Sequence, residues 1–375
     1  MRILFGSLLA RHWDESEVLW TQAASALVRD GHQVSAFFAQ FREAPQLDRL
    51  AMEGVRFYYG STPPQAAWRR WLSRKRSLRE LLAAAFTAEQ PDLVVFCQPD
   101  VSHGLDEILY CQEHGLPYVI INQLVGPLPH DAAVQQRLDR AYRGARHVWF
   151  VSEENRAALT AFLGRDLSQT ESIPNAYDCA YQTELPWPNV PSPVSLAMVG
   201  NVDASSKGHD LVLGALDTPI WRERKVRVTI FGRGPDETAL LTECQRRGLK
   251  QIYFAGHVAS TMSIWRSHHA LLLPSRYEGQ SLAMLEAMLH GRPVIATPVG
   301  GTAGLVVDGK SGFLAASADA RGFADALERA WHQLATWPEM GAAAAARARG
   351  HVVPDSGGAM AARILKHATP AILLS

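Results

Sequence analysis

The sequence predicts an α/β protein made of two doubly wound domains, each a parallel sheet with helices on both faces. Short, near-continuously apolar segments alternate with segments of helical periodicity in both halves of the chain, which is typical of parallel strands buried on both sides. The 375 residues suffice for about two domains at roughly 100–200 residues each. Four prolines within residues 183–193 mark a linker between the two series.

The first half of the chain indicates an N-terminal domain at residues 1–182. A helix is predicted at residues 14–31, where Leu19 and Ala23 share one face and Gly31 ends the helix. The predicted strands, all rich in apolar residues, are 2–5, 33–39, 91–97, 117–122 and 147–152.

The second half repeats this alternation and indicates a C-terminal domain at residues 194–359. Residues 197–216 have the pattern of a strand, a polar loop and a helix, and residues 228–237 that of a strand ending in a Gly-Arg-Gly-Pro turn. A short buried strand at 270–274 precedes a helix at 281–289.

Residues 274–301 predict a site for an anionic ligand that carries hydroxyl groups. The helix at 281–289, with Ser281 as its N-cap, opens at the end of a strand, so its free backbone N–H groups and the positive end of its dipole face that ligand. A diphosphate suits such a place. Glu278, in the loop, and Glu286, just over one turn inside the helix, can accept hydrogen bonds from sugar hydroxyls.

These residues resemble the fingerprint of the retaining glycosyltransferases of family 4, in which two glutamates are separated by seven residues. The resemblance implies the GT-B type of fold, with two Rossmann-like domains facing a central cleft and residues 360–375 packing back on the first domain. It also implies sugar transfer from a nucleoside diphosphate donor, with retention of the anomeric configuration. In this family the first glutamate, here Glu278, holds the transferred sugar, and the second, here Glu286, holds the ribose of the donor.

The loop between the two glutamates departs from the family pattern at two positions. Gln280 stands where an aromatic or aliphatic residue is common, and Ser281 where glycine is common. The resemblance nevertheless places Gly279, Gln280, Ser281 and Leu282 in the donor site, because they surround the start of the helix.

Further donor-binding segments of the family have counterparts in this sequence. Lys207 matches the residue that presents a cation to the donor diphosphate, where it would stabilise the departing group. The family usually has an arginine near the position of Asn201, and Arg233 is a candidate substitute for its charge. The segment that ends at Val258 resembles the one whose backbone contacts the nucleobase.

The resemblance therefore predicts a hexosyltransferase-like enzyme in which Lys207 and Glu278 are catalytic. The co-substrate would be a UDP- or GDP-sugar, and no further cofactor is expected. Because the chain contains no Asp-x-Asp sequence, a metal-dependent nucleotide-sugar site is not supported, and we expect transfer without a metal.

Residues at the acceptor side are less strongly indicated. The family often has histidines at the ends of its first-domain strands, where this sequence has Gln98 and Asn122 followed by Gln123. His103, His130 and Gln123 are the candidates. The acceptor itself stays open among saccharides, lipid-linked acceptors and small molecules.

One basic segment predicts a contact outside the donor site. Six of the twelve residues 68–79 are basic in a chain of zero formal net charge. A helix here would rest on an anionic partner or on membrane headgroups, or else dock with its basic face in solvent. The residues of the proposed contact are Trp68, Arg69, Arg70, Trp71, Arg74 and Lys75.

Composition predicts a cytoplasmic protein, with peripheral contact at the inner face of the membrane if that basic segment binds lipid. The zero net charge gives no reason to expect nucleic acid. No apolar stretch reaches the ~18–20 residues of a membrane span. The four cysteines form no C-x-x-C pair, which favours a reducing compartment and argues against a zinc site; they are Cys97, Cys111, Cys179 and Cys244.

Three alternative functions were weighed against sugar transfer. A nicotinamide-dependent dehydrogenase is disfavoured because the loop after the first strand has only Gly6 and lacks a G-x-G-x-x-G sequence. A nucleotide-sugar epimerase on the same architecture stays open. So does a noncatalytic partner subunit that binds the donor without turnover, since the glycine-rich first loop and the arginine near Asn201 are missing.

Overall fold

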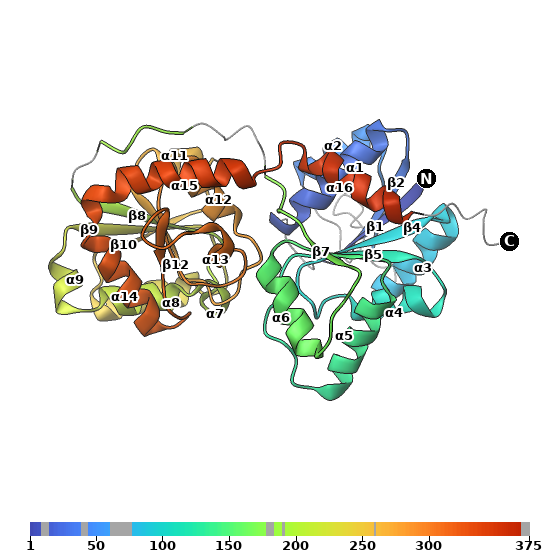
Figure 1. Ribbon diagram of the computed structural model, residues 1–375, viewed down its shortest axis with the longest axis horizontal. Helices are drawn as coiled ribbons and strands as arrows, with labels where there is room; N and C mark the ends of the chain where they lie inside the picture. The colour runs from blue at the N-terminus through green and yellow to red at the C-terminus, as the bar shows by residue number, and fades with distance from the viewer. Residues whose placement is uncertain are drawn as a thin grey trace, which may run out of the picture. The chain divides into compact units, whose positions relative to one another are not determined.

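The fold is described from a computed structural model. It describes residues 1–8, 15–38, 44–60, 77–177, 184–189, 192–258 and 260–368. The chain forms two compact units (Figure 1). Unit 1 comprises Met1–Tyr177 and Val353–Ser375, and unit 2 comprises Asp178–Val352. The chain thus leaves unit 1 a few residues before the predicted linker and returns to it before residue 360.

Unit 1 is built on a seven-stranded sheet in the order β3-β2-β1-β4-β5-β6-β7, and every neighbouring pair is parallel. Its central strands are mostly apolar and almost entirely buried because helices cover both faces of the sheet. The strands are β1 (Arg2–Ser7), β2 (Gln33–Phe38), β3 (Arg56–Tyr59), β4 (Leu93–Gln98), β5 (Tyr118–Asn122), β6 (Val148–Phe150) and β7 (Thr170–Ser172).

Alternate residues of β1 enter two different cores. Ile3 and Phe5 pack with α1 and α16 on one face of the sheet, whereas Leu4 packs with α3 and α4 on the other. The helices of unit 1 are α1 (Val18–Arg29), α2 (Pro45–Glu53), α3 (Leu78–Glu89), α4 (Leu105–Glu113), α5 (Ala132–Gly144), α6 (Glu153–Leu163) and α16 (Ser356–His367), and a 3-10 turn at Glu15–Glu17 precedes α1.

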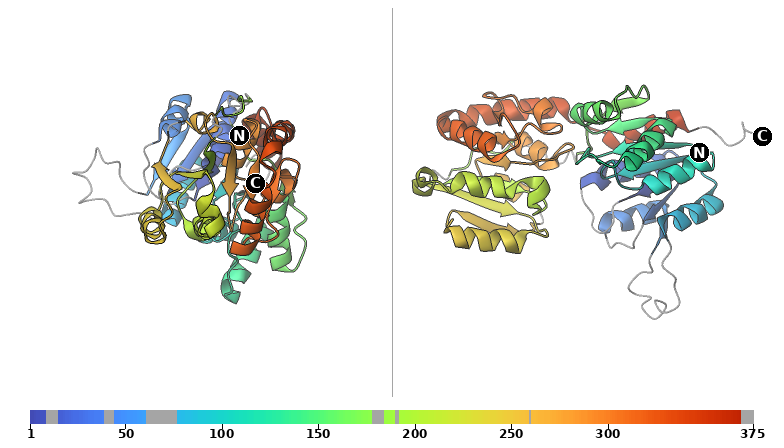
Figure 2. Two further views of the ribbon diagram at one scale, coloured as in Figure 1. Left: turned by 90° about the vertical axis from the view of Figure 1, so that its left-hand side faces the viewer. Right: turned by 90° about the horizontal axis from the view of Figure 1, so that it is seen from below.

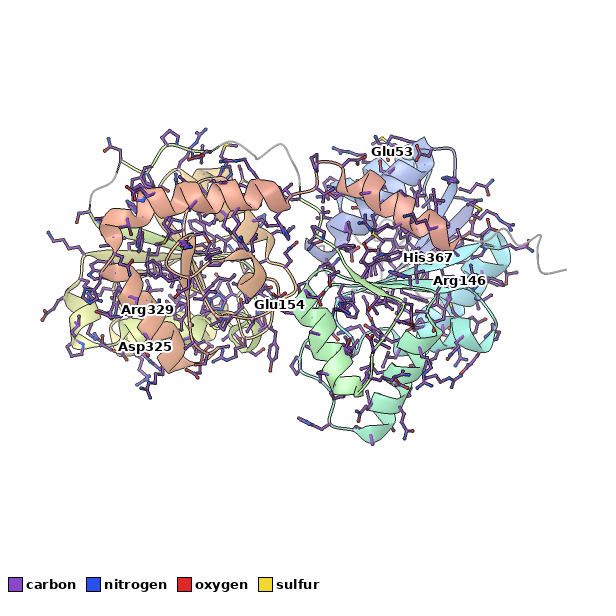
Figure 3. The ribbon with its side chains drawn as sticks, in the orientation of Figure 1. Glu53, Arg146, Glu154, Asp325, Arg329 and His367 are labelled. Atoms are coloured by element: carbon purple, nitrogen blue, oxygen red, sulfur yellow. The ribbon has the colours of Figure 1, made fainter. Side chains whose placement is uncertain are left out.

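The last helix, α16, joins the first part of the chain. It lies beside α1 (Figure 1), and its Met360 and Ile364 are buried in the same core. At its end, the Arg146 guanidinium donates to the His367 carbonyl at 2.7 Å (Figure 3). The helix begins at Ser356 because Asp355 caps it by accepting a hydrogen bond from the Gly358 N–H.

Unit 2 is built on a six-stranded parallel sheet in the order β10-β9-β8-β11-β12-β13. The strands are β8 (Val194–Val199), β9 (Val226–Phe231), β10 (Ile252–Gly256), β11 (Ala270–Leu273), β12 (Val294–Ala296) and β13 (Gly312–Leu314). The helices are α7 (Ala204–Lys207), α8 (His209–Leu216), α9 (Pro219–Glu223), α10 (Glu237–Arg247), α11 (Met262–Trp265), α12 (Leu282–Leu289), α13 (Thr302–Leu305), α14 (Ala320–Trp331) and α15 (Trp337–His351), with a 3-10 turn at Leu334–Thr336.

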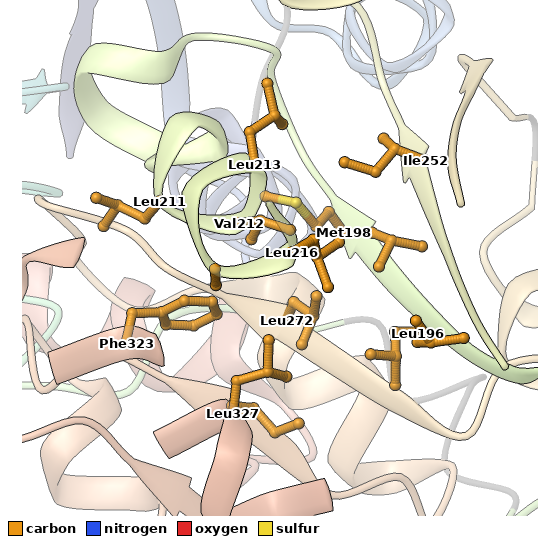
Figure 4. Packing of buried hydrophobic residues seen from close by; sticks show 14 of the residues in the cluster. Leu196, Met198, Leu211, Val212, Leu213, Leu216, Ile252, Leu272, Phe323 and Leu327 are labelled. Atoms are coloured by element: carbon orange, nitrogen blue, oxygen red, sulfur yellow. The ribbon is translucent and has the colours of Figure 1, made fainter. Parts of the chain in front are cut away.

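The core of unit 2 joins β8 to helices from both ends of the unit. Leu196 and Met198 of β8 meet Val212 of α8, while α14 contributes Phe323 and Leu327 to the same cluster (Figure 4). Two further views show helices on both sides of each sheet (Figure 2). The predicted class, two parallel-sheet α/β domains, is therefore confirmed.

The residues of the predicted basic contact, 68–71, 74 and 75, lie outside the described part of the chain, as does Cys179. The next described element is α3, which Ser77 and Glu80 open with a reciprocal capping box. Among the helices of the described ranges, none is both long and apolar enough to cross a bilayer.

Candidate active site

The candidate site lies where several strands of unit 2 end. The strand order of the sheet reverses between β8 and β11, and open α/β sheets bind ligands beyond the carboxyl ends of their strands at such a switch point. We call this side of a sheet its carboxyl edge. At the carboxyl edge of unit 2, the loops after β8, β9, β11 and β12 meet.

Two glycines allow the backbones of these loops to approach closely. Gly208 has φ 66°, and a Cβ atom there would lie 2.0 Å from the Pro274 carbonyl oxygen. Gly300 has φ 50°, and a Cβ atom there would lie 2.0 Å from the Glu278 carbonyl oxygen. No other residue type fits either position without moving the backbone that carries Glu278.

Lys207 and Glu278, the two predicted catalytic residues, form an ion pair. The Lys207 Nζ lies 2.7 Å from Glu278 Oε1, and the Ser275 hydroxyl donates to the same oxygen at 3.2 Å. The Glu278 side chain is 7% exposed and that of Lys207 is 30% exposed. A nearly buried carboxylate is thus neutralised by a cation whose other side is open to solvent.

The short helix α7 holds Lys207 in this position. Asp203 caps the helix through the N–H groups of Ser205 and Ser206. From the β11 loop, Arg276 donates its backbone N–H to the Ser206 carbonyl at 2.7 Å and its side chain to the Ala204 carbonyl at 2.7 Å. The loop that carries the lysine and the loop that carries the glutamate are therefore one connected structure.

Arg276 was missed by the sequence reasoning. Besides its bonds to α7, its guanidinium forms two bonds to Asp210, at 2.8 and 2.7 Å. This fork pairs residues 66 positions apart. The only local signal was an arginine three residues after the strand β11, which is not distinguishable in sequence from a solvated one.

Glu286 lies on α12, whose first turn Ser281 caps by accepting from the Met284 N–H at 3.3 Å. The position of Glu286 inside the helix and the role of Ser281 as its N-cap both agree with the helix predicted at residues 281–289. Burial raises the pKa of Glu286 above its ordinary value, and the neighbouring side chains of Thr261 and Trp265 partly offset this effect. Thr261 and Trp265 lie at the two ends of α11, so the neighbours of Glu286 differ from the residues that bond Glu278.

The loop from Gly279 to Leu282 joins the two glutamates and is largely buried. Gly279 accepts from the Gly301 N–H at 2.7 Å. Gln280 contacts the His351 imidazole through its side-chain amide, and His351 is the last residue of α15. Sequence reasoning missed His351, because it lies 71 positions away.

The remaining predicted donor residues lie on neighbouring loops. Asn201 is exposed in the loop after β8. Arg233, in the loop after β9, is 71% exposed and pairs with Glu237 at 3.6 Å. The two loops are joined where the Val202 N–H donates to the Arg233 carbonyl at 3.0 Å. Val258 follows β10 and is half-buried.

The predicted acceptor-side residues belong to unit 1. His103 is half exposed, and its hydrogen bond with Asp100 raises the pKa of the imidazole. Gln123 is buried, and among the described residues its side-chain N–H₂ group has no hydrogen-bond partner. Both adjoin Gln98, which donates to the His103 carbonyl and accepts from the Gln123 N–H. His130 is exposed.

Within the described ranges, no three or more His, Cys, Asp or Glu side chains are grouped so that they could hold a metal ion.

Comparison with known protein families identifies the two units. The family described as "Glycosyl transferases group 1" matches residues 193–333, and the family described as "Glycosyl transferase 4-like domain" matches residues 16–176. Together the two matches cover most of the chain, one in each unit. The chain therefore belongs to the glycosyltransferases, and its two-domain architecture is the GT-B fold.

Individual relatives match parts of the sequence. A glycogen synthase of Mycobacterium tuberculosis is 26% identical over 253 residues, which are 61% of this chain and 59% of that protein. A D-inositol 3-phosphate glycosyltransferase of Arthrobacter sp. is 41% identical over 86 residues, 23% of this chain and 20% of that protein. The chain thus spans less than two thirds of the length of these relatives.

Solved structures match the whole fold. Alr3699/HepE of Anabaena, determined in complex with UDP, has a TM-score of 0.73 at 18% identity and covers 98% of this chain and 100% of its own. A sucrose-phosphate synthase of Thermosynechococcus elongatus has a TM-score of 0.74 at 16% identity, with 97% and 98% covered. At this level of identity the likeness defines the fold.

Proposed function

We propose that the protein transfers a sugar from a UDP- or GDP-sugar to a hydroxyl acceptor, with retention of the anomeric configuration and without a metal. The observation that carries the proposal is the Lys207–Glu278 pair at the carboxyl edge of unit 2. The pair lies next to the first turn of α12, whose backbone N–H groups and dipole favour a diphosphate.

Each residue of the pair has a distinct task in this proposal. The Lys207 ammonium binds the diphosphate and stabilises the negative charge that grows on it as the bond to the sugar breaks. Glu278, whose oxygen already accepts from Ser275 and Lys207, accepts hydrogen bonds from the hydroxyls of the transferred sugar. Glu286 grips the ribose diol from a separate position on α12.

The relatives and the structural neighbours support the donor class. The D-inositol 3-phosphate glycosyltransferase and glycogen synthase are transferases by name, and Alr3699/HepE has also been determined with UDP-glucose. These names favour transfer over epimerisation. The acceptor stays open among saccharides, lipid-linked acceptors and small molecules, with His103, Gln123 and His130 as the proposed acceptor-side residues.

The test uses purified protein with a panel of UDP- and GDP-sugars. Isothermal titration calorimetry identifies the donor that binds, and slow hydrolysis of that donor reports turnover without a known acceptor. NMR spectroscopy of the first sugar released reports its anomeric configuration. Donor binding with no hydrolysis, and no transfer to any acceptor of a broad panel, would identify a noncatalytic donor-binding subunit instead. Loss of turnover in EDTA, restored by magnesium or manganese, would refute the metal-independent mechanism.

A further inference from the structure

A buried cation behind the donor site has no role in the function proposed so far. Arg292 is 1% exposed, and it precedes β12. Its Nε and Nη2 atoms donate to the Trp265 carbonyl at 2.9 and 2.6 Å. Nη2 also donates to the Pro186 carbonyl at 2.7 Å, and Nη1 to the Leu185 carbonyl at 3.4 Å. Burial lowers the pKa of Arg292 to about 10, an effect that Glu184 opposes.

A buried guanidinium is costly unless its N–H groups are bonded, and here main-chain carbonyls bond them. Such an arrangement fixes backbone segments rather than another side chain. Arg292 therefore joins two segments that are far apart in the sequence: the residues before β8 and the end of α11.

On the first side, Arg292 holds the linker that enters unit 2. Its guanidinium lies over the Trp187 ring, 5.4 Å from the centroid, and Trp187 packs edge-on against His269 at 5.7 Å. Glu184 of the same segment pairs with Arg349 of α15 at 3.4 Å. Residues 184–187 are thus attached to unit 2 by a cation, an aromatic ring and an ion pair.

On the second side, Arg292 holds α11. This helix has four residues, so fixing the carbonyl at its end fixes its beginning as well. Thr261 precedes it, Trp265 ends it, and both side chains act on the pKa of Glu286. Arg292 also reaches α12 directly, because its backbone N–H donates at 2.8 Å to the carbonyl of Ala287, the residue after Glu286. The environment of the glutamate that we assign to the ribose is therefore built by a helix that Arg292 anchors.

We propose that Arg292 is a positioning residue for the nucleoside end of the donor. It holds Thr261 and Trp265 against Glu286. Through its bonds to residues 185 and 186, it also makes the backbone of residues 184–187 better ordered when a nucleotide is bound. The inference rests on the proposed function, because it takes Glu286 as the ribose ligand. It goes beyond that function by assigning a residue that contacts neither the diphosphate nor the sugar, and by tying the linker to nucleotide binding.

The test measures binding of UDP and GDP, and of their 2′,3′-dideoxy forms, to R292K by calorimetry. Lysine keeps the charge but cannot donate in a planar fork to several carbonyls. R292K should bind the ribose form of the preferred nucleotide roughly 10- to 100-fold more weakly, as expected when a binding group is displaced by about 1 Å. Its affinity for the dideoxy form should equal that of the native protein. R321K, at an exposed position of α14, is the matched control and should change neither affinity.

Three outcomes would overturn the inference. R292K could bind the nucleotide with native affinity, or it could lose affinity equally for the ribose and the dideoxy forms. In the third outcome, the loss of binding free energy in the R292K/E286Q double variant would equal the sum of the two single losses. E286Q alone tests the proposed function, because it should abolish the preference for the ribose form. If E286Q binds both forms as the native protein does, the ribose assignment is wrong whatever R292K shows. If R292K does not fold, W187A keeps the guanidinium bonds and should produce a smaller loss that is again confined to the ribose form.

Hydrogen exchange distinguishes the positioning role from a purely structural one, because only the positioning role makes the exchange rate of the linker depend on bound nucleotide. In the native protein, the nucleotide should slow exchange in the peptide covering residues 184–189 as well as in the one covering 261–266. In R292K, protection of 184–189 by a saturating nucleotide should be lost. Retained protection there would show that the linker is ordered independently of Arg292.

Discussion

The carboxyl edges of the two sheets have the same architecture but end in different chemistry. In unit 2, the edge carries charged groups, with Lys207 paired to Glu278, and burial raises the pKa of the nearby Glu286. In unit 1, the ends of β4 and β5 carry neutral amides: the Tyr142 hydroxyl donates to Gln98 at 2.6 Å and accepts from Asn122 at 3.1 Å. The same fold thus carries an ion pair at the switch point of unit 2 and, at the ends of β4 and β5 in unit 1, a network of neutral side chains.

This difference has an energetic meaning. A charged pair with one side open to solvent can gain from an anionic ligand that adds interactions, whereas hydrogen bonds between buried neutral side chains mainly hold the elements of the fold together. Substitutions at the edge of unit 2 should therefore affect activity more than stability. Those in the Gln98–Tyr142–Asn122 network of unit 1 should do the reverse.

The largest expected effect follows removal of the cation of unit 2. K207A should lower donor hydrolysis by about two orders of magnitude or more, the scale for losing one group that stabilises the transition state. Stopped assays with the preferred nucleotide sugar measure the rate, and K250A, an exposed lysine of the same unit, is the control. If K207A hydrolysed the donor within a few-fold of the native rate, Lys207 would not be the group that stabilises the departing diphosphate.

Next in size are the two glutamates, which should fail in different ways. E278Q should lower the hydrolysis rate at saturating donor, because an amide replaces an acceptor oxygen where the sugar is expected. E286Q should mainly weaken nucleotide affinity, since its neighbours belong to α11 and not to the lysine pair. E223Q, on the exposed face of α9, is the control. Identical kinetic profiles for E278Q and E286Q would remove the division between sugar and ribose.

The sequence was sufficient to locate the candidate site of unit 2 because the relevant residues lie on short local patterns. A strand, a glycine-containing loop and a capped helix placed Glu278, Ser281 and Glu286 correctly with respect to α12. Lys207 came from the resemblance, and the structure pairs it with Glu278. The contacts between segments that are far apart in the sequence could not be predicted in this way.

Arg292 illustrates that limit. In the sequence it is one arginine in a turn after a helix, where a solvated position is the ordinary expectation. Its burial becomes evident only when Leu185, Pro186 and Trp265 are brought around it by the fold. The acceptor-side residues were also undetermined for this reason, because the Gln98–Tyr142–Asn122 network forms from three elements.

A smaller effect on catalysis, but a clear one on stability, is expected at the edge of unit 1. Y142F removes a hydroxyl that bonds two buried amides, so the free energy of unfolding should fall by about 1–3 kcal/mol. Urea unfolding measures the change, and calorimetry should show unchanged nucleotide affinity. Y110F, a half-buried tyrosine of α4, is the control. A loss of nucleotide affinity without a loss of stability in Y142F would contradict the scaffold role.

The smallest effect concerns pH and again belongs to unit 1. His147 and His367 stack with their ring centroids 4.7 Å apart where α16 meets the sheet. Burial lowers the pKa of both, and each has a cationic neighbour: His367 for His147, and Arg146 and Lys366 for His367. Glu171, which pairs with Arg363 of α16, opposes the shift in both histidines.

The sign of the effect follows from the lowered pKa values. Above the ordinary pKa of about 6.5, both histidines are neutral in the folded and the unfolded chain and contribute nothing to the pH dependence. Below it, the unfolded chain takes up protons that the folded chain resists, so stability should fall as the pH drops from about 6.5 through the lowered folded values. H367N should flatten this fall, measured as the midpoint of urea unfolding between pH 7.5 and 5. H257N, at an exposed histidine after β10, is the control and should leave the slope unchanged. An unaltered slope in H367N would show that the stacked pair does not set the acid sensitivity of unit 1.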